Sequence, residues 1–313
     1  MSAIRATYRK RGYSASSIDI ILKSWRKSTL DQYCIYAKAW FEFSCNGLRP
    51  NVRNLIEFLT HLHTKGYSHD QLCTARSAVG ALSHISNIGK HPDVKRFFKG
   101  LFEMAPVLPR VVSVWNVTWV FDYLRKLPHQ NELSLQLCGK KLAILICLLA
   151  GGQRSQTVHA IKATDIKVTS EKCFIPIYDP LKQTRRGKHI KPLEFKVYTK
   201  EPKLCVVSNL SAYLEKTRSI RASSPLFISY IKPHKAVSKD TIARWCRDIM
   251  EKSGIDITKY TTHSCRSAAS SMASTRNVEL KKILEACGWS TEQSFAFHYQ
   301  KTITPDIGDV LVQ

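Results

Sequence analysis

Apolar residues recur at helical spacing through the first hundred residues of the chain. The segments 28–43, 51–63 and 68–85 place them at every third or fourth position, as Leu30 and Cys34 show. Such spacing lines one face of an α-helix. Each segment also opens on Ser or Asn, which favour a helix N-cap. The pattern therefore predicts a compact helical bundle.

A Pro-containing stretch at 105–112 interrupts this pattern and predicts a linker. Beyond it, the segments 115–127 and 135–151 are again helical in pattern. The second of them is apolar on all sides, so we expect it at the centre of its domain. The sequence thus predicts a helical domain over residues 1–104 and a second domain over residues 113–313.

The second domain is expected to combine helices with a small amount of β-structure. Segments 172–179 and 191–198 are β-like and flank a basic stretch that contains Gly187, which predicts a hairpin with a basic rim. Helices are expected again at 209–217 and 238–254. The fold class is therefore mainly α with a small β-hairpin or sheet.

The last sixty residues predict three more helices. The first begins near His263, and the second ends at Gly288. The apolar residues expected to bury the second helix are Val278, Leu280, Ile283, Leu284 and Cys287. The third is expected to begin at the capping box formed by residues 290–293, and to carry Tyr299.

Charge points to a polyanionic partner. The chain carries 48 Lys and Arg against 24 Asp and Glu, a formal net charge of +24. Residues 1–104 hold 16 basic and 7 acidic residues, a net +9, which leaves +15 for the remainder. Because both halves are basic, we expect both to contact one extended polyanion. This favours nucleic acid over a membrane surface.

The ten cysteines show neither a C-x-x-C pair nor zinc-ligand spacing. Most lie in apolar periodic runs, so reduced core thiols and a reducing compartment are expected. The longest apolar run, 142–150, is too short for a bilayer span, and no signal peptide is expected at the start. These features favour a protein of the cytoplasm or nucleus that does not enter membranes.

A set of chemically active residues is spread through the second domain. Arg154 follows Gln153 and two glycines. The ten residues from Lys182 to Lys191 include five Lys or Arg. His263 and Arg266 are three positions apart, so they share one helix face. Alone, each residue has an ordinary structural explanation. Together they form an ordered set: Arg154, Lys182, His263, Arg266, Trp289 and Tyr299.

This ordered set resembles the tyrosine recombinase (phage integrase) superfamily, whose catalytic residues run Arg, hairpin Lys, His-x-x-Arg, His or Trp, and Tyr. The segments GGQRSQT, LKQTRRGKH, HSCRSAAS and GWSTEQSFAFHY look most like the eukaryotic branch of DIRS-type retrotransposons and Crypton elements. Two departures stand out. Thr157 replaces a frequent acidic residue, and the interval from Trp289 to Tyr299 is ten where nine is common.

Phosphodiester cleavage without a metal explains why these residue types are needed. Two guanidinium groups, Arg154 and Arg266, suit the charge that develops on the non-bridging oxygens. A phenol is protonated at neutral pH, so its proton needs an acceptor, and His263 can serve or can hold a phosphate oxygen. Tyr299 is the expected nucleophile.

The remaining basic and aromatic residues complete this scheme. Lys182, or else Lys188, is expected to protonate the departing 5′ oxygen. Trp289 offers one N–H to a phosphate oxygen and excludes water. The residues expected to bind DNA are Arg185, Arg186, Lys188 and Lys191. No metal or other cofactor is expected.

The resemblance implies a helical core-binding domain and a catalytic domain with a C-terminal tail. The expected function is site-specific recombination or integration of a mobile element in the nucleus, through a 3′-phosphotyrosyl intermediate. The expected partners are double-stranded DNA and further copies of the chain, as a dimer on each site and a tetramer in the synapse. Two alternatives remain: a type IB topoisomerase-like nicking-closing enzyme, and a domesticated DNA-binding protein without catalysis.

Overall fold

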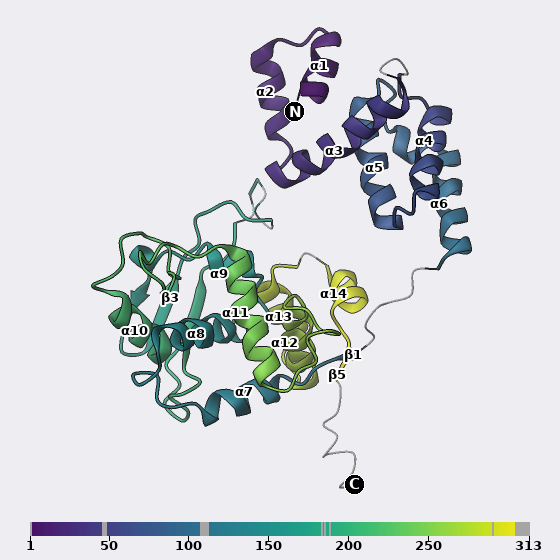
Figure 1. The fold of residues 1–313 in the computed structure, drawn as a ribbon. Coiled ribbons are helices and arrows are strands. Elements are labelled where there is room, and N and C mark those ends of the chain that lie inside the picture. The colour runs from purple at the N-terminus through teal and green to yellow at the C-terminus, as the bar shows by residue number, and fades with distance from the viewer. Residues whose placement is uncertain are drawn as a thin grey trace. The chain divides into compact units, whose positions relative to one another are not determined.

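The computed structural model of the protein describes residues 2–45, 49–106, 113–182, 184, 186–187, 189–289 and 291–303. The chain divides into two compact units, Met1–Pro109 and Arg110–Gln313, each with its own hydrophobic core (Figure 1). As predicted, the fold is mainly helical with a small sheet. Within the described ranges, no helix is both long and apolar enough to cross a membrane.

The first unit is a bundle of helices. Its elements are α1 (Ser2–Lys10), α2 (Ala15–Lys23), α3 (Lys27–Phe43), α4 (Val52–Thr64), α5 (His69–Leu82), the 3₁₀ helix η1 (Ile88–Lys90) and α6 (Pro92–Met104). The large side chains of Trp40 and Phe58 pack edge to face at its centre. The three helices expected from the apolar spacing are present as α3, α4 and α5.

Capping explains where two of these helices begin. Asn51 accepts a hydrogen bond from the Asn54 backbone at 2.8 Å, and Ser68 forms a reciprocal capping box with Gln71. The prediction for α3 was wrong in detail, because this helix begins before Ser28 and has no side-chain cap.

The second unit surrounds one buried helix. Its elements are β1 (Ser113–Val114), α7 (Val117–Lys126), α8 (Leu135–Leu149), α9 (Ser155–His159), η2 (Ala163–Asp165), β2 (Lys167–Val168), β3 (Lys172–Ile175), β4 (Leu193–Lys196), α10 (Val206–Thr217), α11 (Lys239–Lys252), α12 (Ser264–Thr275), α13 (Leu280–Cys287), α14 (Glu292–His298) and β5 (Thr302–Ile303). Helix α8 is buried along almost its whole length and packs against α10, α11 and α12. Its predicted central place is confirmed.

The β-structure forms two small sheets. Strands β2, β3 and β4 are antiparallel, with Cys173 opposite Phe195, so the predicted hairpin is present. Strands β1 and β5 pair in parallel, with Ser113 opposite Thr302. This second pair joins the two ends of the unit, because β1 opens it and β5 follows the segment that holds Tyr299.

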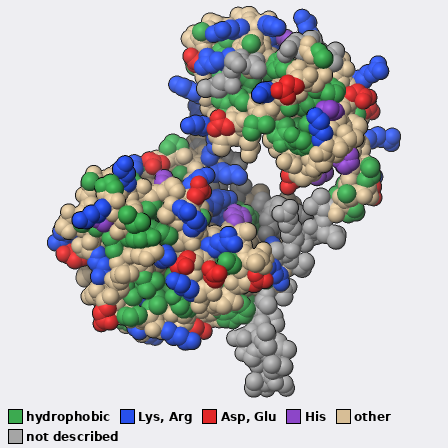
Figure 2. All heavy atoms as spheres, viewed as in Figure 1, with side chains coloured by type: hydrophobic (Ala, Val, Ile, Leu, Met, Phe, Trp, Pro, Cys, Tyr) green, Lys and Arg blue, Asp and Glu red, His purple; other side chains and the backbone are tan. Residues whose placement is uncertain are grey.

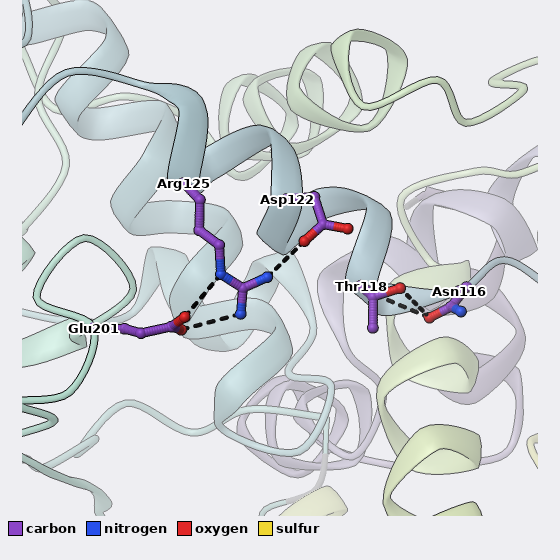
Figure 3. A network of polar contacts seen from close by, with 5 residues as sticks. All are labelled: Asn116, Thr118, Asp122, Arg125 and Glu201. Atoms are coloured by element: carbon purple, nitrogen blue, oxygen red, sulfur yellow. Dashed lines mark hydrogen bonds and ion pairs between the residues drawn. The ribbon is translucent and has the colours of Figure 1, made fainter.

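Helix α7 is held at both ends by side chains (Figure 3). Asn116 caps its start by accepting from the Thr118 backbone at 3.0 Å. Near its end, Arg125 makes a two-point bond with Glu201, at 2.9 and 3.0 Å, and a third bond with Asp122. The Glu201 contact ties α7 to the loop before α10.

The C-terminal helices differ from the sequence prediction in two respects. Val278 is 42% exposed, because it precedes the first turn of α13, whereas Ile283 and Cys287 are buried. Tyr299 follows the last residue of α14 rather than lying within it. The expected capping residue Ser290 lies outside the described residues.

Candidate active site

The chain turns sharply between α8 and α9, at Gly151 and Gly152. Both have positive φ angles, of +80° and +75°. A Cβ atom on Gly152 would lie 2.6 Å from the Arg266 Cα, and one on Gly151 would lie 2.7 Å from the Ala286 Cβ. Only glycine fits both the conformation and the space. The turn therefore packs directly on α12 and α13, and places Arg154 at the start of α9.

Two side chains lock this turn to α13. Gln153 Nε2 donates to the carbonyls of Ala150, at 2.8 Å, and Ala286, at 2.7 Å. The Cys287 thiol donates to the Gly151 carbonyl at 2.8 Å. Burial raises the pKa of this thiol to about 11, which keeps it protonated. The sequence analysis did not single out Gln153 and expected Cys287 only as a buried residue of its helix, and a position next to a glycine is their only further signal.

Arg266 is 1% exposed and is held from several sides. One terminal nitrogen donates to the Gly152 carbonyl at 2.9 Å, and the other donates to the Cys287 carbonyl. The guanidinium lies over the Trp289 ring, 4.4 Å from its centroid, and 5.4 Å from that of Tyr299. Its Nε is buried and has no hydrogen-bond partner within the described structure.

Arg154 follows the glycine turn and is the N-cap residue of α9. It is partly buried, and its Nη1 is a second buried donor that no described residue satisfies. Burial lowers the pKa of Arg266, and the positive charge of Arg154 lowers it further. Thr157, which occupies the position of a frequent acidic residue, is buried in α9.

His263 is the N-cap residue of α12 and already has helical backbone angles. Part of its side chain is exposed, yet desolvation is the main cause that lowers its pKa below the usual 6.5. Four positive charges add to this effect: Arg154, Arg266, Lys182 and Lys301. His263 is therefore neutral at neutral pH and able to accept a proton.

Tyr299 stacks on Trp289, with ring centroids 4.3 Å apart and an angle of 31° between the planes. Its ring also lies 6.3 Å from that of His263, in an edge orientation. Phe295, 2% exposed, packs on the Trp289 ring as well. Trp289 Nε1 is a third buried donor left unsatisfied by the described residues.

The basic stretch between β3 and β4 contributes Lys182, which lies in an exposed turn and acts electrostatically on His263. Arg186 is exposed as well. Lys191 forms a salt bridge with Glu285 of α13 at 2.9 Å, so part of its charge is already paired. The two other predicted DNA-binding residues, Arg185 and Lys188, lie outside the described residues.

The six residues singled out in the sequence thus meet at one place. The rings of Trp289, His263 and Tyr299 and the Arg266 guanidinium form one cluster, and Arg154 and Lys182 act on His263 through their charges. Lys301, which sequence reasoning missed, adds another charge from just beyond Tyr299. A cluster of cations with unpaired donors is suited to an anion such as a phosphate.

Several solved structures share this fold. The XerH site-specific recombinase bound to a palindromic difH substrate, in a post-cleavage complex, is 17% identical with a TM-score of 0.59, covering 87% of this chain and 76% of that one. The Tn1549 transposon integrase in complex with transposon right end DNA is 11% identical with a TM-score of 0.59, covering 99% and 97%. A lambda integrase dimer bound to a COC′ core site is 14% identical with a TM-score of 0.51, covering 93% and 97%.

A search of curated protein sequences finds no match. The family model described as "Phage integrase family" matches residues 124–302, which include every residue of the cluster. Since this match extends over more than half of the sequence, the chain belongs to the phage integrase family.

Proposed function

We propose that the protein is a site-specific DNA recombinase that cuts and rejoins strands through a 3′-phosphotyrosyl bond to Tyr299. One observation carries the proposal. Three N–H donors, on Arg154, Arg266 and Trp289, are buried without partners in the described structure, and the side chains of Arg266 and Trp289 contact the Tyr299 ring. Buried donors in native proteins are normally satisfied, so this arrangement favours a bound anion with several acceptor oxygens. A DNA phosphodiester is such an anion.

Strand cleavage then proceeds as one displacement at phosphorus. The Tyr299 oxygen attacks, its proton passes to the neutral His263, and the bond from phosphorus to the 5′ oxygen breaks. Lys182 gives a proton to that departing oxygen, which leaves a free 5′-hydroxyl. Attack by a 5′-hydroxyl on the phosphotyrosyl bond reverses each transfer and rejoins the strand.

The two arginines stabilise the charge that builds up during attack. Arg266 is fixed by two backbone carbonyls and by stacking on Trp289, so it needs little reorganisation when the phosphate arrives. Arg154 approaches from the start of α9, on another element. Two guanidiniums on separate elements can neutralise both non-bridging oxygens.

DNA binding is proposed to involve both units. Lys and Arg side chains are distributed over each of them, in line with the formal charge of +24 (Figure 2). Lys182 and Arg186 are exposed in the hairpin, beside the cluster. Arg185, Lys188 and Lys191 are proposed to grip phosphates there. Such contacts position a protein on DNA but do not read its sequence.

The biological setting belongs to the proposal as well. The residue pattern of the DIRS-type and Crypton branch favours a mobile-element recombinase that acts in the nucleus. Residues 1–104 act as the core-binding domain and 113–313 as the catalytic domain. The active assembly is a dimer on each site and a tetramer in the synapse, and the first of these is in keeping with the dimeric lambda integrase complex of similar fold.

Covalent trapping tests this function. The intact protein is incubated with nicked duplexes, from which the short cleaved fragment diffuses away so that religation fails. A denaturing gel should show a DNA adduct in wild type and in Tyr178→Phe, which changes an exposed tyrosine elsewhere. Two intact duplexes that both carry the site separate strand exchange from nicking and closing, since only strand exchange joins DNA of one duplex to DNA of the other. If no adduct formed with DNA from the ends of a mobile element, the proposal would be overturned.

A further inference from the structure

Ser271 of α12 connects the cationic cluster to the backbone of Tyr299 and Lys301. Its side chain is 2% exposed. The hydroxyl donates to the Tyr299 carbonyl at 2.8 Å and accepts from the Lys301 backbone N–H at 3.1 Å. One hydroxyl therefore satisfies two backbone groups on either side of Gln300, in a stretch that is neither helix nor strand.

This contact lies between two regular elements. On one side, the Tyr299 backbone N–H donates to Phe295 in α14, at 2.9 Å. On the other side, Thr302 begins β5 and pairs with Ser113 of β1. The Ser271 hydroxyl thus fixes the residues that join α14 to β5.

The same helix holds the groups that the phenol faces. His263 caps α12 and Arg266 lies in its first turn, five positions before Ser271. A bond from α12 to the Tyr299 backbone therefore sets the distance from the nucleophile to both groups. Near-attack geometry is sensitive to displacements of about 1 Å, so the loss of this bond should slow attack without changing how DNA is bound.

We propose that Ser271 is a positioning residue for the nucleophile: its hydroxyl holds the Tyr299 backbone against α12, so that the phenol stands in line with the scissile phosphate. This inference rests on the proposed function. It concerns the rate of adduct formation, and Ser271 itself touches neither DNA nor the reacting atoms.

The test compares single-turnover adduct formation on nicked duplexes at saturating protein, together with DNA affinity. Ser271→Ala should form the adduct roughly 10- to 100-fold more slowly than wild type, with affinity unchanged within a few fold. Ser271→Thr keeps the hydroxyl and should restore most of the rate. Ser271→Val has the shape of threonine without the hydroxyl and should be as slow as alanine.

Ser270→Ala is the matched control. Ser270 is also buried on α12, but among the described residues its hydroxyl bonds only to the Arg266 and Ser267 carbonyls of its own helix. It should cleave near the wild-type rate, and thermal melting should show each variant folded. Wild-type rates in Ser271→Ala, or equal rates in Thr and Val, would overturn the positioning role while leaving the recombinase function intact. Absence of any adduct in wild type would overturn both.

Discussion

The Arg266 guanidinium lies 4.4 Å from the centroid of the Trp289 ring, while the carbonyls of Gly152 and Cys287 hold its two terminal nitrogens. The stack and the two bonds fix the plane of the guanidinium. Only its Nε is left without a partner in the described structure. Arg266 is therefore set in place by backbone groups before any ligand arrives.

Arg266→Lys should reduce the rate of adduct formation by about 100- to 1000-fold, as the loss of one preorganised donor does in other active sites. A lysine ammonium cannot bridge two carbonyls and stack on an indole at once. The rate on nicked duplexes measures the effect. Arg276→Lys, at the exposed end of the same helix, should remain near wild type. A wild-type rate in Arg266→Lys would contradict the assigned role.

Tyr299→Phe should abolish the covalent adduct, because it removes only the attacking oxygen. DNA affinity should stay within a few fold, since the ring still stacks on Trp289. A denaturing gel and a binding titration measure the two effects. If the adduct persisted in this variant, the nucleophile would have to be another tyrosine, and Tyr260→Phe would be the next variant to examine.

The pH dependence of the rate of adduct formation should follow the protonation of His263. Because burial and neighbouring positive charges lower its pKa, His263 remains a neutral base below pH 6.5, and adduct formation should decline only in more acidic buffer. Lys301→Gln removes one of these charges and should shift the decline to higher pH. Lys282→Gln, on α13, should leave it in place. An unchanged profile in Lys301→Gln would contradict this account.

The same pKa shift affects stability. The unfolded chain binds a proton at His263 more readily than the folded protein does, so the free energy of unfolding should fall as pH drops from 6.5 through the lowered pKa. Above pH 6.5 this contribution is constant. The free energy of unfolding of wild type, measured by denaturant titration, should therefore fall relative to that of His263→Gln on acidification. Parallel curves would show that His263 is not the group responsible.

DNA affinity should depend steeply on salt. If both units together neutralise about eight phosphates, log affinity should fall against log salt with a slope of about −7, because each contact releases counterions. The separate units, 1–109 and 110–313, should each bind weakly and with shallower slopes. A slope of about −2 for the intact chain would mean that the protein contacts only about two phosphates.

Removal of residues 304–313 tests assembly. This segment contains Ile307, Val310, Leu311 and Val312, and lies outside the described residues. If it docks on a neighbouring protomer, the truncated protein should bind a single half-site normally but lose cooperative binding to paired half-sites and strand exchange. A gel-shift titration distinguishes the two states. Undiminished cooperativity would mean that the segment packs on its own protomer or plays no part in assembly.

Several helices, the β3–β4 hairpin and a set of candidate site residues could be predicted from the sequence. Local signals were sufficient for this: apolar spacing for α3, α4, α5 and the buried α8, and capping residues at Asn51 and Ser68. The ordered set from Arg154 to Tyr299 was recognisable because each residue type has a chemical reason to be present. Val278 was wrongly predicted to be buried. The helical spacing of apolar residues starts there, before the first residue of α13.

Only the tertiary structure decided how these residues are held. The groups that orient Arg266 are backbone carbonyls, at Gly152 and Cys287, and a carbonyl has no sequence signature. The Ser271 bond to Tyr299 spans 28 positions, and the β1–β5 pair joins residues from the two ends of the unit. Apolar spacing reports contacts within one helix or strand. Contacts between distant segments depend on how those elements pack, which single positions do not encode.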